Sequence, residues 1–279
     1  MDIIQSIILG IVEGLTEFLP VSSTGHMIIT QHLLGIESTP FVKAYTVIIQ
    51  LGAILSVLVL YWRRFFYPDS RQQGHSWWGS IWRFYLKLVV GVFPAVVLGL
   101  MFNKMIDKAL GSVLVVAVML VLGGIFMLFC DRIFNKGTES TQLNYKKAFI
   151  IGVIQCISMI PGVSRSMATI VGGMSQKLTR RNAAEFSFFL AVPTMLGASV
   201  LELYKMTAAG ETNILAEGNN LNVLLLGAFV SFVVAIAAIK FFINYVSKYG
   251  FKAFGWYRIA VGLILLIALL NGVNLQMVD

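Results

Sequence analysis

Charged residues are scarce in this chain. They make up 12% of its 279 residues, while hydrophobic residues make up 58%. This excludes an ordinary soluble domain, in which about a quarter of the residues are charged. Only two cysteines are present, Cys130 and Cys156, so neither a disulfide framework nor a metal site of paired cysteines is expected. The apolar runs do not alternate with polar residues, which excludes a membrane β-barrel. A helical integral membrane protein remains, and the mean hydropathy of +0.83 agrees with it.

The densest group of ionisable side chains interrupts an apolar run near the N-terminus, in EGLTEFLPVSSTGH (13–26). At the centre of a bilayer each such group costs about 2.5–3.5 kcal/mol on insertion scales, so it usually marks function. Glu13 and Glu17 lie on one face of a helix, which Pro20 then interrupts because it lacks a backbone donor. The alternative is an interfacial helix whose polar face meets water, and the apolar residues on both sides argue against it.

Three pairs of segments match at nearly constant offsets, which predicts an internal duplication. An offset of 142 aligns two of the pairs and an offset of 136 aligns the third. The pairs are Leu9–Glu13 with Ile151–Gln155, Val21–Thr24 with Val163–Ser166, and Gly91–Phe93 with Gly227–Phe229. We therefore expect a single membrane domain, 1–279, in which 1–134 forms the first repeat and 147–279 the second.

Each expected repeat begins with an apolar segment that is too broken to span a bilayer, which takes about 20 apolar residues. Residues 1–34 and 148–176 are divided by Pro20 and by Pro161-Gly162, and we expect both to form re-entrant helix hairpins. Three long apolar runs follow each hairpin: 41–62, 83–103 and 112–130, then 185–204, 223–243 and 257–274. Because three is odd, the second repeat is inverted, as in many transporters. The expected fold is an all-α integral membrane protein with two inverted-topology repeats.

The basic residues divide unevenly between the two sides of this topology. Sixteen lie on one side, four on the other, and Arg165 lies within the membrane. The sixteen are Arg63, Arg64, Arg71, Arg83, Lys87, Arg132, Lys136, Lys146, Lys147, Lys177, Arg180, Arg181, Lys240, Lys248, Lys252 and Arg258; the four are Lys43, Lys104, Lys108 and Lys205. By the positive-inside rule the basic side is cytoplasmic and both termini face outwards. The net charge of +8 is explained in this way, so no nucleic-acid partner is expected.

The second break, PGVSRSMAT (161–169), has the composition of an anion site. Gly162 permits a tight turn, and the helix that resumes near Ser164 presents free amides and a positive dipole end. Arg165 adds a planar fork that binds two phosphate oxygens at once, and Thr169 adds a hydroxyl. The alternative is a helix cap whose arginine extends to the cytoplasmic surface. The duplication favours the anion site, because it brings this turn beside the first one.

Together the two clusters predict phosphoryl transfer. Arg165 and the helix start would hold a phosphate, and the carboxylates of Glu13 and Glu17 would hold a hard divalent cation, Mg²⁺ or Ca²⁺. Ser23 and His26, three residues apart, suit a nucleophile and a proton-transfer partner. We favour Ser23 as the nucleophile because it lies nearer the break. Attack by His26 or by water stays open, as does Glu17 in place of His26 as the base.

The chain resembles the undecaprenyl-diphosphatase family, also called the bacitracin-resistance family. The resemblance is carried by EGLTEFLPVSSTGH (13–26) and PGVSRS (161–166), and it continues through QLGAILSV (50–57) and FPAVVLGL (93–100). It implies hydrolysis of a C55 polyprenyl diphosphate to the monophosphate and phosphate, at the outer face of the bacterial cell membrane. It also implies a divalent cation and a homodimer. Such an enzyme recycles the lipid carrier of cell-wall synthesis and confers bacitracin resistance.

Family roles carry over position by position. The catalytic set is Glu17, Ser23, His26 and Arg165; the substrate-binding set is Ser22, Gly162, Ser164, Ser166 and Thr169; the metal pair is Glu13 and Glu17. Met167 departs from the family, which commonly has glycine after the SRS triplet, and its bulk is expected to narrow the turn or contact the lipid chain. A polyprenyl-phosphate transporter or flippase is the alternative function, since inverted repeats with broken helices also suit transport. Transport needs the phosphate clamp but no proton-transfer pair.

Overall fold

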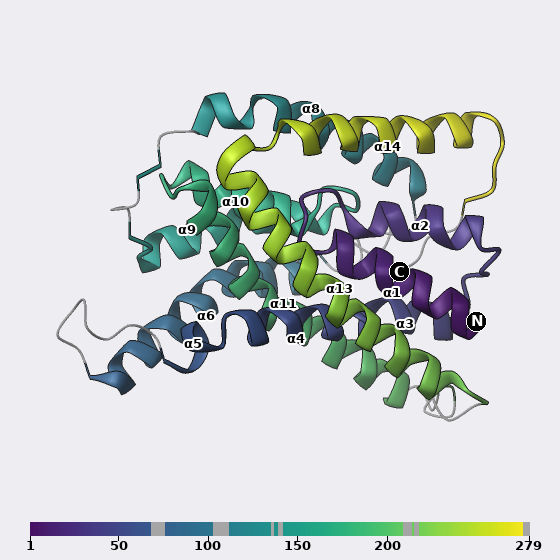
Figure 1. Ribbon diagram of the computed structural model, residues 1–279, viewed down its shortest axis with the longest axis horizontal. Helices are drawn as coiled ribbons and strands as arrows, with labels where there is room; N and C mark the ends of the chain where they lie inside the picture. The colour runs from purple at the N-terminus through teal and green to yellow at the C-terminus, as the bar shows by residue number, and fades with distance from the viewer. Residues whose placement is uncertain are drawn as a thin grey trace.

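The computed structural model describes residues 1–67, 76–102, 112–134, 137–138, 142–208, 214 and 218–275, and every element in these ranges is a helix (Figure 1). The elements are α1 (Ile3–Thr16), α2 (Ser23–Leu33), α3 (Pro40–Ile48), α4 (Gln50–Leu60), α5 (Trp62–Phe66), α6 (Trp77–Met101), α8 (Val113–Phe134), α9 (Tyr145–Gln155), the 3₁₀ turn η1 (Cys156–Met159), α10 (Arg165–Ser175), α11 (Arg180–Ala208), α13 (Asn220–Tyr249) and α14 (Lys252–Leu270).

Within the described residues, six helical stretches are long and apolar enough to cross a bilayer. They are Pro40–Leu60, which combines α3 and α4, Trp77–Met101, Val113–Phe134, Arg180–Tyr204, Asn220–Tyr249 and Lys252–Leu270. Each coincides with one of the six predicted spans, although several begin earlier than expected. The all-α, multi-pass membrane class is therefore confirmed.

Local sequence explains where several helices begin. The α1 helix starts with a capping box, in which the Asp2 side chain accepts from the backbone N–H of Gln5 and the Gln5 side chain accepts in return from the N–H of Asp2. Thr39 caps α3 directly before Pro40, and Asn144 caps α9. Each cap satisfies a backbone donor that has no partner inside the helix.

Two turns interrupt the shorter helices where the sequence predicts breaks. The first turn (residues 17–22) separates α1 from α2, and the second turn (residues 160–164) separates η1 from α10. Each ends in a serine with a positive φ, +69° at Ser22 and +77° at Ser164. Residues other than glycine rarely adopt such values. The same uncommon conformation thus recurs at the offset of 142 found in the sequence.

Glycine permits a close crossing between the first helix of each half and a helix of the other half. The α1 helix packs on α13, where a Cβ at Gly10 would lie 2.6 Å from the carbonyl oxygen of Gly227. The α9 helix packs on α6, where a Cβ at Gly152 would overlap the carbonyl of Gly91. In each crossing the first helix of one half packs on a helix of the other half, so the halves interleave. Small residues allow such contact in membranes, where packing drives helix association.

The α8 and α14 helices run side by side along the upper edge of Figure 1. They approach closely at Gly124 and Gly255, since a Cβ at Gly124 would lie 2.7 Å from the carbonyl oxygen of Gly255. This pair covers the region of the two turns. It also contributes two side chains to the site described below, Tyr257 and Arg258.

The assignment of Arg258 to the basic cytoplasmic surface is wrong. Its side chain is 0% exposed and donates hydrogen bonds to backbone carbonyls inside the bundle. Arg258 lies within α14 and faces the two turns. The carbonyls of these turns have no donor within a helix, so they can accept hydrogen bonds from its guanidinium. Of the other charges counted above, Arg71, Lys104, Lys108, Lys136 and the side chain of Lys205 lie outside the described residues.

Gly152→Ala is expected to destabilise the protein, because the added methyl group overlaps the backbone of Gly91 and the two helices must separate. Overpacking of this kind costs about 1–3 kcal/mol. Gly197→Ala on α11 is the matched control, since nothing lies within 4 Å of a Cβ there. Thermal unfolding in detergent should show a lower Tm for Gly152→Ala alone. Equal Tm values for the two variants would contradict the close crossing.

Candidate active site

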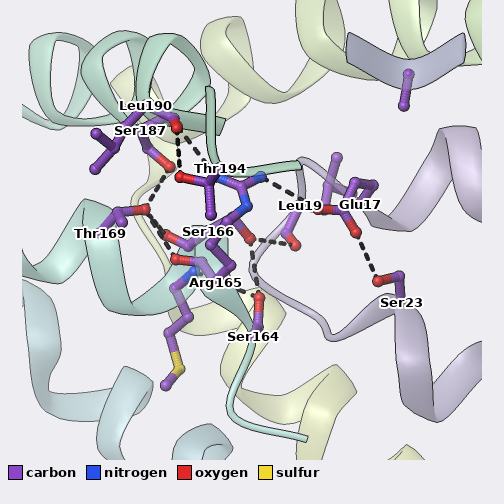
Figure 2. A network of polar contacts seen from close by, with 12 residues as sticks. Glu17, Leu19, Ser23, Ser164, Arg165, Ser166, Thr169, Ser187, Leu190 and Thr194 are labelled. Carbon is purple, nitrogen blue, oxygen red and sulfur yellow. Dashed lines mark hydrogen bonds and ion pairs between the residues drawn. The ribbon is translucent and has the colours of Figure 1, made fainter. Parts of the chain in front are cut away.

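A buried ion pair joins the end of α1 to the start of α10. Glu17 is the C-terminal cap of α1, and Arg165 is the first residue of α10. Nη2 of Arg165 lies 3.2 Å from Oε1 of Glu17, and the two side chains are 11% and 9% exposed (Figure 2). The partners are 148 positions apart and adjoin different turns. The pair therefore exists only where the two halves meet.

The guanidinium of Arg165 has a second anchor on α11. Nη1 donates to the carbonyl oxygen of Ser187 at 3.1 Å, and the guanidinium carbon lies 6.0 Å from the centre of the Phe18 ring. Nε has no hydrogen-bond partner among the described residues. A buried donor left unpaired costs about 1–3 kcal/mol. A bound anion that accepts from this N–H would remove that cost.

The hydroxyl of Ser23 donates to Oε2 of Glu17 at 2.7 Å (Figure 2). Glu17 thus bridges Ser23 and Arg165, with one carboxylate oxygen for each. Ser23 is the first residue of α2 and directly follows Ser22, whose φ is positive. A carboxylate in contact with a serine hydroxyl is the arrangement of a general base and a nucleophile.

The hydrogen bonds of His26 are made with groups other than Ser23, its expected partner. Its Nδ1 lies 2.7 Å from the carbonyl oxygen of Ser22, and its Nε2 lies 2.8 Å from the hydroxyl of Tyr257 on α14. Because a carbonyl only accepts, Nδ1 donates to it, and in the neutral ring Nε2 then accepts from the Tyr257 hydroxyl. The two rings also stack, with centroids 5.5 Å apart. Glu17, the other candidate for the base, is the residue to which the Ser23 hydroxyl donates.

Ser166 and Thr169 are fully buried and bonded within the protein. The Ser166 hydroxyl donates to the carbonyl of Leu19 at 2.8 Å, which ties the second turn to the first (Figure 2). The Thr169 hydroxyl donates to the carbonyl of Arg165 at 2.8 Å and lies 2.6 Å from the Ser187 hydroxyl. Both residues shape the surroundings of Arg165.

The remaining predicted binding residues lie in the two turns themselves. Ser164 is half-buried and its hydroxyl caps α10. Gly162 has a φ of +87°, and a Cβ there would lie 2.5 Å from the carbonyl oxygen of Val116, so only glycine fits. Ser22 is 3% exposed and presents its carbonyl to His26. Gly162 and Ser22 therefore act through their backbone.

Met167, the departure from the family pattern, is 8% exposed and borders an apolar cavity of about 340 Å³. The cavity lies between α8, α9, η1 and α10, and its other walls are Met119, Leu122, Gly123, Phe126, Ile154, Ile157, Val163, Ala168 and Val171. The side chain at position 167 thus occupies apolar space beside the second turn.

Glu13 lies one turn before Glu17 on α1 and is 1% exposed. Among the residues that the structure describes, no group of three or more His, Cys, Asp and Glu side chains forms a metal site. Mg²⁺ is usually bound by one or two carboxylates and completes its coordination with water and substrate phosphate. Two buried carboxylates on one helix face fit that pattern.

Three side chains at the site were not predicted from the sequence. Ser187 contacts Arg165 from α11. From α14, Tyr257 contacts His26, and Arg258 binds the backbone of both turns. An arginine inside an apolar run is a recognisable sign of function. A serine or tyrosine on a long span carries no comparable signal.

Comparison with known proteins identifies relatives over the whole length of the chain. The family model described as "Bacitracin resistance protein BacA" matches residues 6–264. A protein of Porphyromonas gingivalis named undecaprenyl-diphosphatase is 57% identical, with 99% of each chain covered. Proteins with the same name are 54% identical in Flavobacterium psychrophilum, with 96% of each chain covered, and 49% identical in Bdellovibrio bacteriovorus, with 100% of each covered. The chain belongs to the bacitracin resistance protein BacA family.

Proposed function

We propose that this protein hydrolyses undecaprenyl diphosphate to the monophosphate and inorganic phosphate in the bacterial cell membrane. It thereby recycles the lipid carrier of cell-wall synthesis and confers bacitracin resistance. The family and the names of its relatives support this activity. The observation that carries it is the buried carboxylate of Glu17, bound on one side to the Ser23 hydroxyl and on the other to Arg165. A nucleophile, a base and a phosphate clamp lie together in an apolar protein suited to a lipid substrate.

Ser23 is the proposed nucleophile. Its Oγ attacks the terminal phosphorus while its proton passes to Oε2 of Glu17, 2.7 Å away. The bond from phosphorus to the bridging oxygen breaks, and undecaprenyl monophosphate leaves. Water then attacks the phosphoserine, which releases phosphate and restores the hydroxyl, so one water molecule is consumed in each cycle. The proton of that water passes to Nε2 of His26 through the hydroxyl of Tyr257, which lies 2.8 Å from that nitrogen.

Arg165 binds the terminal phosphate. A diphosphate carries more negative charge than one carboxylate and offers two oxygens to the planar fork, so it competes well with Glu17 for the guanidinium. Once Arg165 turns to the phosphate, Oε1 of Glu17 is released, while Oε2 keeps its hydrogen bond to the Ser23 hydroxyl. Substrate binding thereby leaves one carboxylate oxygen for the proposed cation and the other for the proton of Ser23.

Acid-quenched protein should carry the transferred phosphate on Ser23 after brief exposure to polyprenyl diphosphate, because phosphoserine survives acid and phosphohistidine does not. Ser23→Ala should lose both the trapped phosphate and most turnover. Ser175→Ala is the control, since that residue is at the opposite end of α10 from Arg165 and its hydroxyl donates to the carbonyl of Gly172 and accepts from Nε2 of Gln176. Acid-labile phosphate on His26 would reverse the assignment. Substantial turnover by Ser23→Ala would instead indicate direct attack by water.

Glu13 and Glu17 are the proposed ligands of Mg²⁺ or Ca²⁺. A cation bound there would neutralise charge on the phosphate that is transferred. Two carboxylates one helix turn apart leave coordination sites for substrate and water. Glu17 also binds the Ser23 hydroxyl and the Arg165 guanidinium, whereas Glu13 is proposed to bind the cation alone.

Glu17→Gln should therefore lose most turnover at any cation concentration, while Glu13→Gln should mainly raise the concentration needed for half-maximal activity. Phosphate release measured across a titration with Mg²⁺ or Ca²⁺ separates these effects. Glu37→Gln, at an exposed position, is the control. Equal losses in the first two variants that excess cation does not restore would contradict the ranking.

The two halves, 1–134 and 147–279, are proposed to be inverted repeats. The serines with positive φ are related by the offset of 142, and so are Gly10 and Gly152. The two glycine crossings are reciprocal as well, since α1 packs on α13 and α9 packs on α6. A duplicated unit explains why these features recur at nearly the same spacing.

The hairpins, 1–34 and 148–176, are proposed to be re-entrant. Their helices have 11 to 14 residues, whereas a span takes about 20. In Figure 1, α1 begins at the N-terminus on the right and α9 lies on the left, so the hairpins enter from opposite ends and turn near the centre. Irregular backbone at membrane depth is tolerated where protein surrounds it.

The termini and the mouth of the site are proposed to face outwards. Arg258 is buried and no longer counts towards either side. The other basic residues still give the predicted excess on the cytoplasmic side, opposite the termini. In Figure 1, α5 with Arg63 and Arg64 lies at the end away from the N-terminus, and α2 runs back from the first turn towards the N-terminal end. The homodimer and the expected lack of a nucleic-acid partner stay predictions.

Purified protein in detergent should release phosphate from a polyprenyl diphosphate, and EDTA should reduce the rate. The relatives' names give the transporter alternative no support. A C55 monophosphate in place of the diphosphate is the negative control, because it contains no phosphoric anhydride. Absence of release with Mg²⁺, Ca²⁺ and other divalent cations would contradict the proposed function.

A further inference from the structure

The side chain of Arg258 lies against both turns of the site. It is 0% exposed, and its terminal nitrogens donate four hydrogen bonds, all to backbone carbonyls. Nη1 binds the carbonyls of Pro20 and Val163, each at 3.1 Å. Nη2 binds those of Gly162 at 2.8 Å and Met119 at 3.1 Å. One guanidinium thus connects the first turn, the second turn and α8 to α14.

The arrangement follows the internal duplication. Pro20 and Gly162 are separated by the same offset of 142, so one nitrogen binds a carbonyl of the first turn and the other binds its counterpart in the second. Carbonyls in a broken helix have no intrahelical donor, and inside a membrane water cannot satisfy them. A planar group with several fixed donors suits this task better than an ammonium group.

Among the residues that the structure describes, no carboxylate forms an ion pair with Arg258. The ion pairs in the described part of the chain involve Arg165, Arg180 and Arg181 but not Arg258. Its Nε also has no partner there. Burying an unbalanced charge is costly, and neutral donors could bind the same carbonyls at a lower desolvation cost. A positive charge at the junction of the turns would attract the anionic head group of the substrate.

We propose that Arg258 is a positioning residue for the phosphatase reaction, an inference that rests on the proposed function. Glu17 precedes Pro20 by three residues, and Arg165 follows Gly162 by three. By fixing these two carbonyls against one rigid group, Arg258 sets the distance between the Glu17 carboxylate and the Arg165 guanidinium. Arg258 need not touch the substrate to control how well the base and clamp are aligned.

Gly123 offers a way to displace this group without removing it. A Cβ at Gly123 would overlap Nη2 of Arg258 and lie 3.0 Å from its guanidinium carbon. Gly123→Ala should therefore push the guanidinium away from Gly162 while the arginine and its charge remain. Gly99→Ala is the matched control, because the nearest atom to a Cβ there is the Met159 Cε at 3.6 Å.

Arg258→Lys and Gly123→Ala should each lower kcat by up to the order of 10²-fold, the loss that a displacement of about 1 Å can cause. KM should stay within about threefold, because the clamp itself is retained. Arg180→Lys is the control for a general loss of stability, since it weakens the partly buried ion pair in which Nε of Arg180 lies 2.8 Å from Oδ1 of Asp131. It should lower Tm and leave kcat unchanged. Adding Gly123→Ala to Arg258→Lys should cause no further loss, because a lysine lacks the displaced nitrogen.

The outcomes separate this inference from the function on which it rests. Wild-type protein that releases no phosphate in the same assay refutes the proposed function. Active wild-type protein with unchanged kcat in both Arg258→Lys and Gly123→Ala overturns the role of Arg258. The role is also overturned if Arg180→Lys loses as much kcat as Arg258→Lys and Gly123→Ala for the same drop in Tm, since the losses would then reflect stability alone. If Arg258→Lys does not fold, Gly123→Ala measured against Gly99→Ala decides.

Discussion

The ion pair between Glu17 and Arg165 is the contact on which the rest of the site depends. Both side chains are almost fully buried, and removing one partner of such a pair typically costs about 3–5 kcal/mol because it leaves a charge uncompensated. The partners adjoin turns from different halves of the chain, so neither half can build the site alone. The same carboxylate accepts a hydrogen bond from Ser23, so the proposed nucleophile is oriented only when the two halves have packed together.

The two turns that carry this pair are held in a demanding conformation. A non-glycine residue with an unfavourable backbone costs about 1–3 kcal/mol, and Ser22 and Ser164 both have a positive φ. Bonds between the turns stabilise them: Ser166 donates to Leu19, and Arg258 binds carbonyls on both sides. Backbone strain of this kind persists only where many contacts with the surrounding structure fix the conformation. The interleaved packing of α1 on α13 and of α9 on α6 supplies those surroundings.

The six spans, both breaks and the meeting of the two clusters are predictable from the sequence, because prolines, ionisable residues in apolar runs and a nearly constant repeat offset can be read from it directly. The contacts from α11 and α14 are not predictable in this way. Arg258 stands out in the sequence as an arginine in an apolar run. Its partners cannot be predicted, because they are backbone carbonyls, which every residue carries. Ser23 and His26 were expected to pair because they are three residues apart. Ser23 instead meets Glu17 across the first turn, and the direction of a side chain at a helix start depends on the turn's dihedral angles.

A double-mutant cycle on stability tests most directly whether the two halves meet through this ion pair. Thermal unfolding in detergent would compare Glu17→Gln, Arg165→Met and the double variant with the wild type. Residues in contact typically show coupling of about 0.5–3 kcal/mol. Each single substitution should lower Tm, and the double variant should be no less stable than either single variant, because it leaves no charge unpaired. A drop in Tm equal to the sum of the two single effects would show that Glu17 and Arg165 are not coupled.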